Sequence, residues 1–519
     1  MKKLFYYVAS ILLLGIALNC SEEKPEGEKP DRNMFGHNIP RGLTKTTEGL
    51  SPGYVLLSVP NSGSTYLLNR KGEVVHIWKG SYGSFSSNPY LMDDGSIFLT
   101  EDDPDYPVFD AGGNNGRLEK ISWDGKILWD FEYADEQQLL HHDIAVKPNG
   151  NILAIAYEAM SYDEALALGR APHLIPHSGP YMEKIIELKP DGLHGANIVW
   201  EWHIKDHLIQ DLDETKPNFG NPADHPELLS FNTGDSIPPV ISQDSLETLK
   251  SIDRAGPNTT RFNAWSDIYH FNAINYNPAL QQIAISSPEL SEIIIIDHST
   301  TTEEAASHEG GRSGMGGDLL YRWGNPENYH HGDSTNRRLW YQHDVRWIEA
   351  GKPGAGNLTI YNNNVPNGPD TLDYSSVYEI KPPLTAAGTY ELRTDGSYGP
   401  DALEWNYVAP DTLSFYGSFI SSAHRMENGN TFINEGPKGR FFEVTPENDI
   451  VWEFLNPYRG EARDLNGDPV RHMPWTYSTF RSTFVPEDHP AFAGKELKPL
   501  DPQPAVYKMP PPPPEKKKE

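Results

Sequence analysis

The stretch Glu73-Val74-Val75-His76-Ile77-Trp78 decides the fold of this chain. It reads as a β-strand that follows a turn, Arg70-Lys71-Gly72, and ends in an aromatic residue. The same shape returns at irregular spacing, which makes an internal repeat. The further copies are residues 126–129, 198–202, 319–323, 402–405 and 449–452.

A second strand precedes each copy, and a first strand often follows a glycine turn such as Asn149-Gly150-Asn151. Six repeats of three to four strands predict an all-β fold, a six-bladed β-propeller with long inter-strand insertions. A β-sandwich would not repeat six times, and a solenoid would have a tighter period. We expect the chain near 475–484 to supply a closing outer strand. Two segments break the pattern, 205–265 and 298–317, and are either functional lids or passive surface loops.

The composition excludes several classes of function. The formal net charge of −30 argues against binding nucleic acid, whose phosphates need a basic face. The single cysteine, Cys20, allows no disulfide within the chain and no cysteine-based metal site. Neither a Gly-x-Ser-x-Gly elbow nor a phosphate-binding or dinucleotide-binding glycine motif occurs.

The N-terminus reads as a lipoprotein leader. Lys2 and Lys3 precede an apolar run at 4–18 that is short for a membrane span, and Ala17-Leu18-Asn19-Cys20 resembles a lipobox with Cys20 as the lipidated residue. An ordinary signal peptide or anchor is the alternative. We therefore expect a signal peptide at 1–20, a flexible tether at 21–48, the propeller at 49–486 and a Pro-rich disordered tail at 487–519. The protein would lie in the cell envelope, periplasmic or at the outer-membrane surface, in contact with membrane only through its lipid.

Three histidines fall at the same place in the repeat: His142, His270 and His343 each lead into the first strand of a blade. Those positions converge on the central channel of a propeller, so the three imidazoles form a ring around one cavity. Ser87 and Ser421 occupy the same register in two other blades. Imidazole can act as base, acid or nucleophile near neutral pH. The alternative is that the histidines cap strands by hydrogen bonding to neighbouring blades. Three histidines could also bind zinc, but no His-Glu-x-x-His spacing supports that, and we expect no metal.

Several short segments together resemble the arylsulfotransferase family, over roughly residues 50–485. They are Leu140-His141-His142-Asp143-Ile144, Ser266-Asp267-Ile268-Tyr269-His270-Phe271-Asn272, Tyr321-Arg322-Trp323-Gly324-Asn325-Pro326, Gln342-His343-Asp344 and Gly439-Arg440-Phe441-Phe442-Glu443-Val444. The resemblance implies transfer of a sulfuryl group, without PAPS or another cofactor, from a phenolic sulfate ester to a histidine and then to a phenol. It implies that His270 and His343 stabilise the sulfate oxygens and transfer protons. Tyr269 and Trp347 are candidates for the walls around the aryl group.

The nucleophile of the family lies in a late blade, where His424 is the histidine available between His343 and His472. His424 is therefore our candidate nucleophile. However, it sits three residues beyond the His142 register, and an odd offset faces the other side of a regular strand. A bulge would be needed to turn it inward. Otherwise His424 is structural, and the nucleophile is His142, His270 or His343.

The arginine that the family carries after the Gln-His-Asp strand has no counterpart here, because that stretch reads Asn362-Asn363-Asn364-Val365-Pro366-Asn367. Arg425 or Arg346 could replace it. We assign substrate binding to His142, Arg425, Asn363 and Tyr269. Three functions stay open: a sulfotransferase, an aryl-sulfate hydrolase that uses water as acceptor, and a non-catalytic propeller that binds an anionic or aromatic ligand. A homodimer is also left open.

Overall fold

The computed structural model describes residues 33–36, 38–59, 62–84, 87–103, 109, 111–234, 240–251, 255, 259–369, 371–459 and 477–506. The expected signal peptide with Cys20, residues 21–32 of the expected tether and residues 507–519 of the expected tail lie outside this set. No helix within the described residues is long and apolar enough to cross a membrane.

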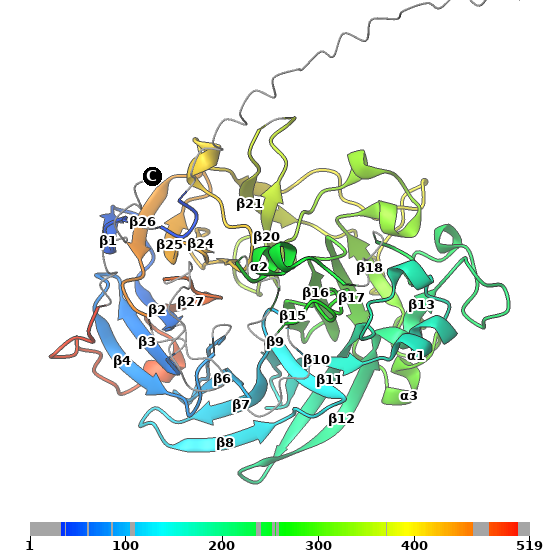
Figure 1. Ribbon diagram of the computed structural model, residues 1–519. Helices are drawn as coiled ribbons and strands as arrows, with labels where there is room; N and C mark the ends of the chain where they lie inside the picture. The colour runs from blue at the N-terminus through cyan, green and yellow to red at the C-terminus, as the bar shows by residue number, and fades with distance from the viewer. Residues whose placement is uncertain are drawn as a thin grey trace, which may run out of the picture. The chain divides into compact units, whose positions relative to one another are not determined.

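The described strands form six antiparallel sheets of at least four strands, arranged in a ring as blades (Figure 1). The prediction of a six-bladed β-propeller is confirmed. From the centre outward, blade one contains β27 (Ser482–Pro486), β2 (Gly53–Ser58), β3 (Ser64–Asn69) and β4 (Val74–Lys79), and blade two contains β5 (Tyr90–Leu91), β6 (Ile97–Asp102), β7 (Gly116–Ile121) and β8 (Ile127–Glu132). In the same order, blade three contains β9 (Gln138–Val146), β10 (Ile152–Ala159), β11 (Tyr181–Asp191) and β12 (Gly195–His203), and blade four contains β15 (Ala273–Asn277), β16 (Gln282–Ser287), β17 (Glu292–Asp297) and β18 (Leu319–Trp323). Blade five contains β19 (His343–Trp347), β20 (Leu358–Val365), β21 (Tyr374–Ile380) and β22 (Trp405–Tyr407), and blade six contains β23 (Ser422–Arg425), β24 (Thr431–Glu435), β25 (Arg440–Val444) and β26 (Ile450–Leu455).

The aromatic residue of each repeat lies on the fourth strand of its blade, counted from the centre, and fills the space between adjacent sheets. Trp78 of β4, for example, is fully buried against Ile97 and Ile121 of blade two. Five of the tryptophans also donate their indole N–H to a backbone carbonyl in the next blade. These bonds join Trp129 to Gly195, Trp202 to Gly317, Trp323 to Pro400, Trp405 to Pro446 and Trp452 to Arg70, at 2.7–2.9 Å. The repeat therefore supplies both apolar contact and a blade-to-blade hydrogen bond, each of the latter worth about 1 kcal/mol.

Both ends of the described propeller differ from the sequence expectation. The closing strand β27 pairs with β2 as the innermost strand of blade one, rather than as an outer strand. The outer position is taken by β1 (Gly42–Thr46), which pairs with β26 as a fifth strand of blade six. Residues 42–46, expected in the tether, thus belong to the sheet, because the free edge of β26 offers unpaired backbone groups.

Part of the expected disordered tail is also packed on the propeller. The 3₁₀ turn Pro490–Phe492 places Phe492 in the cluster between blades one and two, where its ring meets that of Tyr54. Farther along, the Gln503 side chain accepts a hydrogen bond from the backbone N–H of Val74. The folded unit therefore extends beyond residue 486, to at least Gln503.

The first insertion follows the outermost strand of blade three and reaches the middle of the ring in the view of Figure 1, and the second lies between β17 and β18 of blade four. Residues 205–265 contain the two-stranded parallel sheet of β13 (Leu208–Ile209) and β14 (Leu229–Ser230) and the helix α2 (Gln243–Ser251). Residues 298–317 contain α3 (Thr302–Ala305), which packs on β12. A further helix, α1 (Tyr162–Ala167), lies between β10 and β11.

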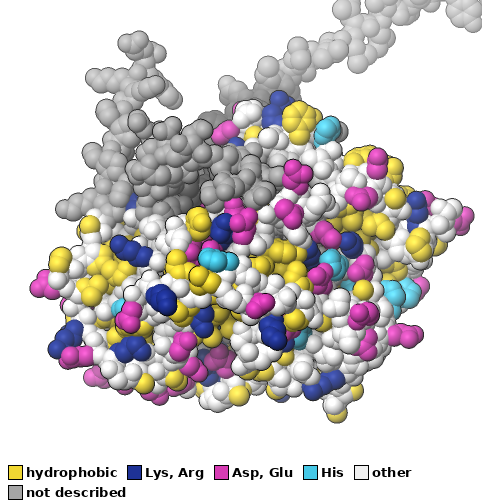
Figure 2. Space-filling model, turned by 90° about the horizontal axis from the view of Figure 1, so that it is seen from below, with side chains coloured by type: hydrophobic (Ala, Val, Ile, Leu, Met, Phe, Trp, Pro, Cys, Tyr) yellow, Lys and Arg dark blue, Asp and Glu magenta, His cyan; other side chains and the backbone are white. Residues whose placement is uncertain are grey.

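On the face shown in Figure 2, Lys and Arg side chains are interspersed with Asp and Glu instead of forming a basic stripe.

Candidate active site

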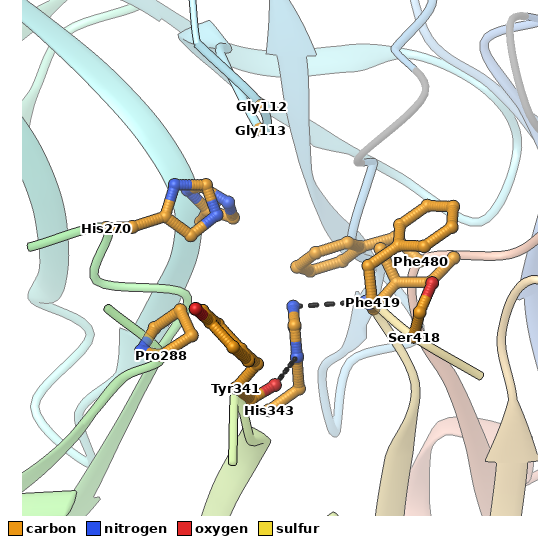
Figure 3. A pocket seen from close by; sticks show the side chains of 11 residues that line it. Gly112, Gly113, His270, Pro288, Tyr341, His343, Ser418, Phe419 and Phe480 are labelled. Carbon is orange, nitrogen blue, oxygen red and sulfur yellow. Dashed lines mark hydrogen bonds between the residues drawn. The ribbon is translucent and has the colours of Figure 1, made fainter. Parts of the chain in front are cut away.

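His142, His270 and His343 come together around one cavity, as the repeat register predicts. His142 lies within β9, His270 lies three residues before β15, and His343 is the first residue of β19. Aromatic side chains line the cavity beside the three histidines (Figure 3). Its volume is about 20 Å³, close to that of a single water molecule. The lining residues are Gly112, Gly113, His142, His270, Pro288, Tyr341, His343, Ser418, Phe419, Ile420 and Phe480.

The backbone is irregular at or directly beside each of these histidines. His142 and His270 have φ of 55° and 52°, in the left-handed region that side chains other than glycine rarely adopt. In β9 the pairing with β10 shifts between Ala154 and Ala156, so His142 lies in a bulge. Such a conformation costs roughly 1 kcal/mol or more and persists where the surroundings enforce it, often at functional sites.

His142 is the terminal member of a buried chain that starts at Glu183. The Glu183 carboxylate lies 2.9 Å from His141 Nε2, and His141 Nδ1 lies 2.7 Å from His142 Nδ1. If His141 donates from Nε2 to the carboxylate and is neutral, its Nδ1 accepts from His142 Nδ1–H. The Nε2 of His142 then carries a free lone pair, and it has no hydrogen-bond partner among the described residues.

Burial keeps His142 in this neutral state. It lowers the pKa of His142 well below the usual range, and the neighbouring His270, His141 and His343 lower it further. The imidazole is also confined from one side, because Gly113 has φ of 76° and a Cβ there would lie 2.1 Å from His142 Nε2. His142 thus presents a neutral, oriented nitrogen to the cavity.

His270 forms a dyad with Asp267. Its Nδ1 hydrogen-bonds the Asp267 carboxylate, which also accepts from Tyr157 Oη at 2.9 Å. Burial alone would raise the pKa of Asp267, but His270, His141 and Tyr157 lower it on balance, so the carboxylate is ionised. The ring of His270 stands edge-on to that of His142, with centroids 4.4 Å apart. A carboxylate that holds one imidazole nitrogen leaves the other, Nε2, able to gain or lose a proton.

Both ring nitrogens of His343 are already engaged. Nε2 accepts a hydrogen bond from the backbone N–H of Ile420 at 3.0 Å, so Nδ1 carries the proton and donates to Asn363 Oδ1 at 2.9 Å. Burial lowers the pKa of His343 to about 3. This side chain is a neutral, fixed wall of the cavity. Asn363 contacts it from behind and donates to the carbonyls of Gly417 and Ile420, so Asn363 positions His343 and does not line the cavity.

The other sequence candidates lie elsewhere. The pairing of β23 with β24 is regular, so no bulge turns His424 inward, and its Nε2 accepts from the backbone N–H of Phe484 in β27. His424 and Arg425 line a second cavity of about 220 Å³, and Arg425 pairs with Glu379. Tyr269 is buried but does not line the histidine cavity.

Trp347, the second candidate wall, and Arg346, a candidate replacement for the family arginine, also do not line the histidine cavity. Trp347 packs in the core between blades four and five. Arg346 pairs with Asp344 at 2.7 Å. The aromatic walls of the cavity are instead Tyr341, Phe419 and Phe480, none of which the motifs indicated.

The sequence profile of the arylsulfotransferase (ASST) family matches residues 34–455. This chain belongs to the arylsulfotransferase family. It is therefore a member of an enzyme family whose substrates are aryl sulfates and phenols. No curated protein sequence matches the chain significantly.

Solved structures similar to this arylsulfotransferase-family chain have low identity. A protein of unknown function from Bacteroides caccae has 12% identity and a TM-score of 0.39, with 78% of this chain and 94% of the other covered. Virginiamycin B lyase from Staphylococcus aureus has 10% identity and a TM-score of 0.33, with coverages of 80% and 88%. The Dos1 propeller has 8% identity and a TM-score of 0.30, with coverages of 82% and 77%.

Arg481 is a buried cation near the cavity of this arylsulfotransferase-family protein that the sequence motifs did not indicate. It precedes β27, is 2% exposed, and forms ion pairs with Asp143 at 2.7 Å and Asp344 at 2.9 Å. Burial would lower its pKa, but the two carboxylates raise it on balance, so the guanidinium is charged. It stands beside Phe480 of the cavity wall, but it does not line the cavity itself. The sequence did show that an aspartate directly follows both His142 and His343. Because two buried carboxylates require a cation, this pattern could have indicated a buried basic residue near the histidines.

Proposed function

We propose that this protein transfers a sulfuryl group from a phenolic sulfate ester to a phenol, with His142 as the nucleophile and His270 as the acid and base. The observation that carries the proposal is the pair of differently held imidazoles in one cavity. His142 ends a chain that leaves Nε2 with its lone pair, whereas the carboxylate of Asp267 stabilises a proton on His270.

In the first half-reaction, His142 Nε2 attacks sulfur, an N–S bond forms, and the bond between sulfur and the aryl oxygen breaks. His270 Nε2–H gives its proton to the leaving phenolate. In the second half-reaction, an acceptor phenol gives its proton to His270. The oxygen of this phenol attacks sulfur, and the N–S bond breaks. The donor ester supplies the sulfuryl group, so the cycle needs no nucleotide cofactor.

The chain behind His142 supports the intermediate. Sulfation at Nε2 makes the ring cationic, and its Nδ1–H then points to His141 Nδ1, which in turn is held by Glu183. The buried carboxylate can therefore offset the positive charge as it develops. His343 and the aromatic residues Tyr341, Phe419 and Phe480 would surround the aryl group. Because the cavity holds about 20 Å³, binding of an aryl sulfate requires these side chains to move apart.

The test is acceptor-dependent release of phenol from a chromogenic aryl sulfate, with mass spectrometry of the donor-treated protein. We expect release only with an acceptor phenol, and a sulfated histidine at residue 142. His142→Ala should abolish both, whereas His424→Ala should retain both, because His424 faces the other cavity. Sulfation of His424 or His270 would overturn the assignment of the nucleophile.

The same assay separates the other functions. Release without a phenol acceptor would indicate a hydrolase. Saturable binding of the donor without any release would indicate a non-catalytic propeller. Either result would contradict the proposed transfer.

We also infer attachment to the cell envelope through lipid on Cys20, from the lipobox-like residues that precede it. Metabolic labelling with palmitate and fractionation of membranes test this. Wild-type protein should be labelled and sediment with membranes, and Cys20→Ala should be unlabelled. Equal labelling of the two proteins would contradict the inference.

A further inference from the structure

The two long insertions meet at a cluster of two histidines and one aspartate. His207 belongs to the first insertion, His308 to the second, and Asp318 directly precedes β18. Each of the three side chains offers one nitrogen or oxygen atom that could bind a metal ion, and these three atoms lie within 4.8 Å of one another. The Nδ1 atoms of both histidines lie 2.8 Å from the same oxygen, Asp318 Oδ1. None of the three residues lines either of the two cavities described above.

The hydrogen bonds of His207 point to a cation in this cluster. Its Nε2 lies 2.8 Å from the backbone carbonyl of Ala305, which can only accept, so Nε2 carries a proton. In a neutral imidazole Nδ1 is then an acceptor, yet it faces a carboxylate oxygen, which is another acceptor. A positive charge is needed between them, either a second proton or a metal ion.

The His207 side chain is rigidly held, as the ligand of a built metal site would be. It is fully buried, and its ring stacks on Trp202 with an interplanar angle of 3°. Gly317 packs against its edge, where a Cβ would lie 2.7 Å from His207 Nε2 and 2.0 Å from the Ala305 carbonyl oxygen. A bond from the second ring nitrogen to a backbone carbonyl is also how metal-binding histidines are commonly oriented.

We propose that His207, His308 and Asp318 bind a divalent transition-metal ion of the zinc class. Two imidazole nitrogens and one carboxylate oxygen suit Zn²⁺, with water as the fourth ligand. His308 is 62% exposed and can move by the fraction of an ångström that coordination at about 2.0 Å requires. The ion cross-links both insertions to β18, so it stabilises the outer side of blades three and four. The three residues share no motif spacing, which is why the sequence did not indicate the site.

Isothermal titration of tag-free, EDTA-treated full chain with ZnCl₂ tests the proposal. We expect one Zn²⁺ per chain, a higher melting temperature with Zn²⁺ than with Mg²⁺, and the visible absorption of four-coordinate Co²⁺ when that ion is the probe. His308→Ala should weaken Zn²⁺ binding at least tenfold and should still fold, because the side chain is exposed. Asp318→Asn, which keeps the size of the side chain, should weaken it similarly.

His225→Ala is the matched control. His225 is an exposed histidine with Nδ1 2.9 Å from Glu227, but it has no third ligand within reach in the described part of the chain. Its replacement should leave Zn²⁺ affinity unchanged. Absence of stoichiometric binding, or equal affinity in wild type and His308→Ala, would show that a proton supplies the charge and would overturn the proposal.

Discussion

At the residue scale, the cavity histidines differ in what holds them rather than in where they lie. All three occupy the same position of the repeat, but their partners differ. A histidine contacts the ring of His142, and an aspartate contacts the ring of His270. A backbone N–H and an asparagine contact the ring of His343. The partner decides which ring nitrogen carries a proton. In the transfer that we propose, one register therefore supplies a nucleophile, an acid–base group and a fixed wall.

Replacement of Gly113 by alanine should uncouple activity from stability. The new Cβ would overlap the His142 ring, which His141 prevents from moving away, so we expect sulfuryl transfer to fall about 100-fold or more. The backbone cost of alanine at positive φ is only about 1 kcal/mol. Steady-state rates and thermal melting check this. Gly125→Ala, at φ of 81° in open space, has the same backbone cost and should leave the rate unchanged; equal rates in both variants would contradict the role of Gly113.

The sequence could predict the shared histidine register but not the partners of each histidine. The register follows from the repeat, because equivalent positions of a propeller converge. Asp267 lies three residues before His270 and was within reach of sequence reasoning, whereas Glu183 reaches His141 from another strand. The displacement of His424 follows from its odd offset on a regular strand, which the sequence did show. Arg481 could not be located, because its two carboxylates come from blades three and five.

At the element scale, the ring closes by pairing the last strand of the described chain with one near its start. β27 and β2 pair over five residues, and Gly53 lies at the end of this pairing. The sequence predicted that a late segment closes the ring but placed it on the outside. The innermost position follows from the order of the repeat, since blade one supplies only its three outer strands from the N-terminal side.

A side chain at Gly53 should weaken the closure. Gly53 has φ of 154°, and a Cβ would lie 2.4 Å from the carbonyl oxygen of Val485 and 2.7 Å from the Phe484 ring. We expect Gly53→Ala to lower the free energy of unfolding by about 2–3 kcal/mol, because backbone rather than a flexible side chain must move. Gly150→Ala, at φ of 85° with nothing within 4 Å, should cost only about 1 kcal/mol. Urea denaturation measures both, and equal losses would show that the contact with β27 is unimportant.

At the scale of the whole molecule, Arg481 joins blades that are not neighbours in the ring. Its chain position is in the closing segment of blade one, and its two ion-pair partners lie in β9 of blade three and β19 of blade five. Asp143 in turn accepts from the backbone N–H of Ile274 in blade four, and Asp344 from that of Ala423 in blade six. The centre of the ring is thus a buried polar network in place of an apolar core.

Removal of Arg481 should destabilise the whole ring. Arg481→Met leaves the buried carboxylate of Asp143 without an ion-pair partner among the described residues and Asp344 with Arg346 alone, and such a loss typically costs about 3–5 kcal/mol. Arg338→Met, which breaks an exposed pair with Asp401, should cost less than about 1 kcal/mol. Adding Asp143→Asn to Arg481→Met should recover part of the loss, because it removes one unpaired charge. Denaturant titration of the four proteins checks this, and the absence of recovery would show that packing, rather than charge, explains the loss.

Buried neutral histidines should make the propeller sensitive to acid. Burial lowers the pKa of His343 and of His424 to about 3, and that of His142 well below its usual range. Below about pH 6.5 the unfolded chain protonates these histidines and the folded chain does not. Stability is therefore present above pH 6.5 and lost as pH falls, by about 1.4 kcal/mol per pH unit for each histidine.

The contribution of one histidine can be isolated with His424→Gln. Its amide oxygen can still accept the Phe484 N–H, but the side chain does not titrate. Glu101, whose pKa burial and Glu119 raise to about 10, acts in the opposite direction in this range, but it is the same in both proteins. Between pH 6 and 5, the free energy of unfolding should therefore fall less steeply in the variant, by about 1.4 kcal/mol per pH unit. Urea titrations at pH 7, 6 and 5 measure the two slopes, and parallel slopes would mean that His424 is protonated in the folded protein or neutral in both states.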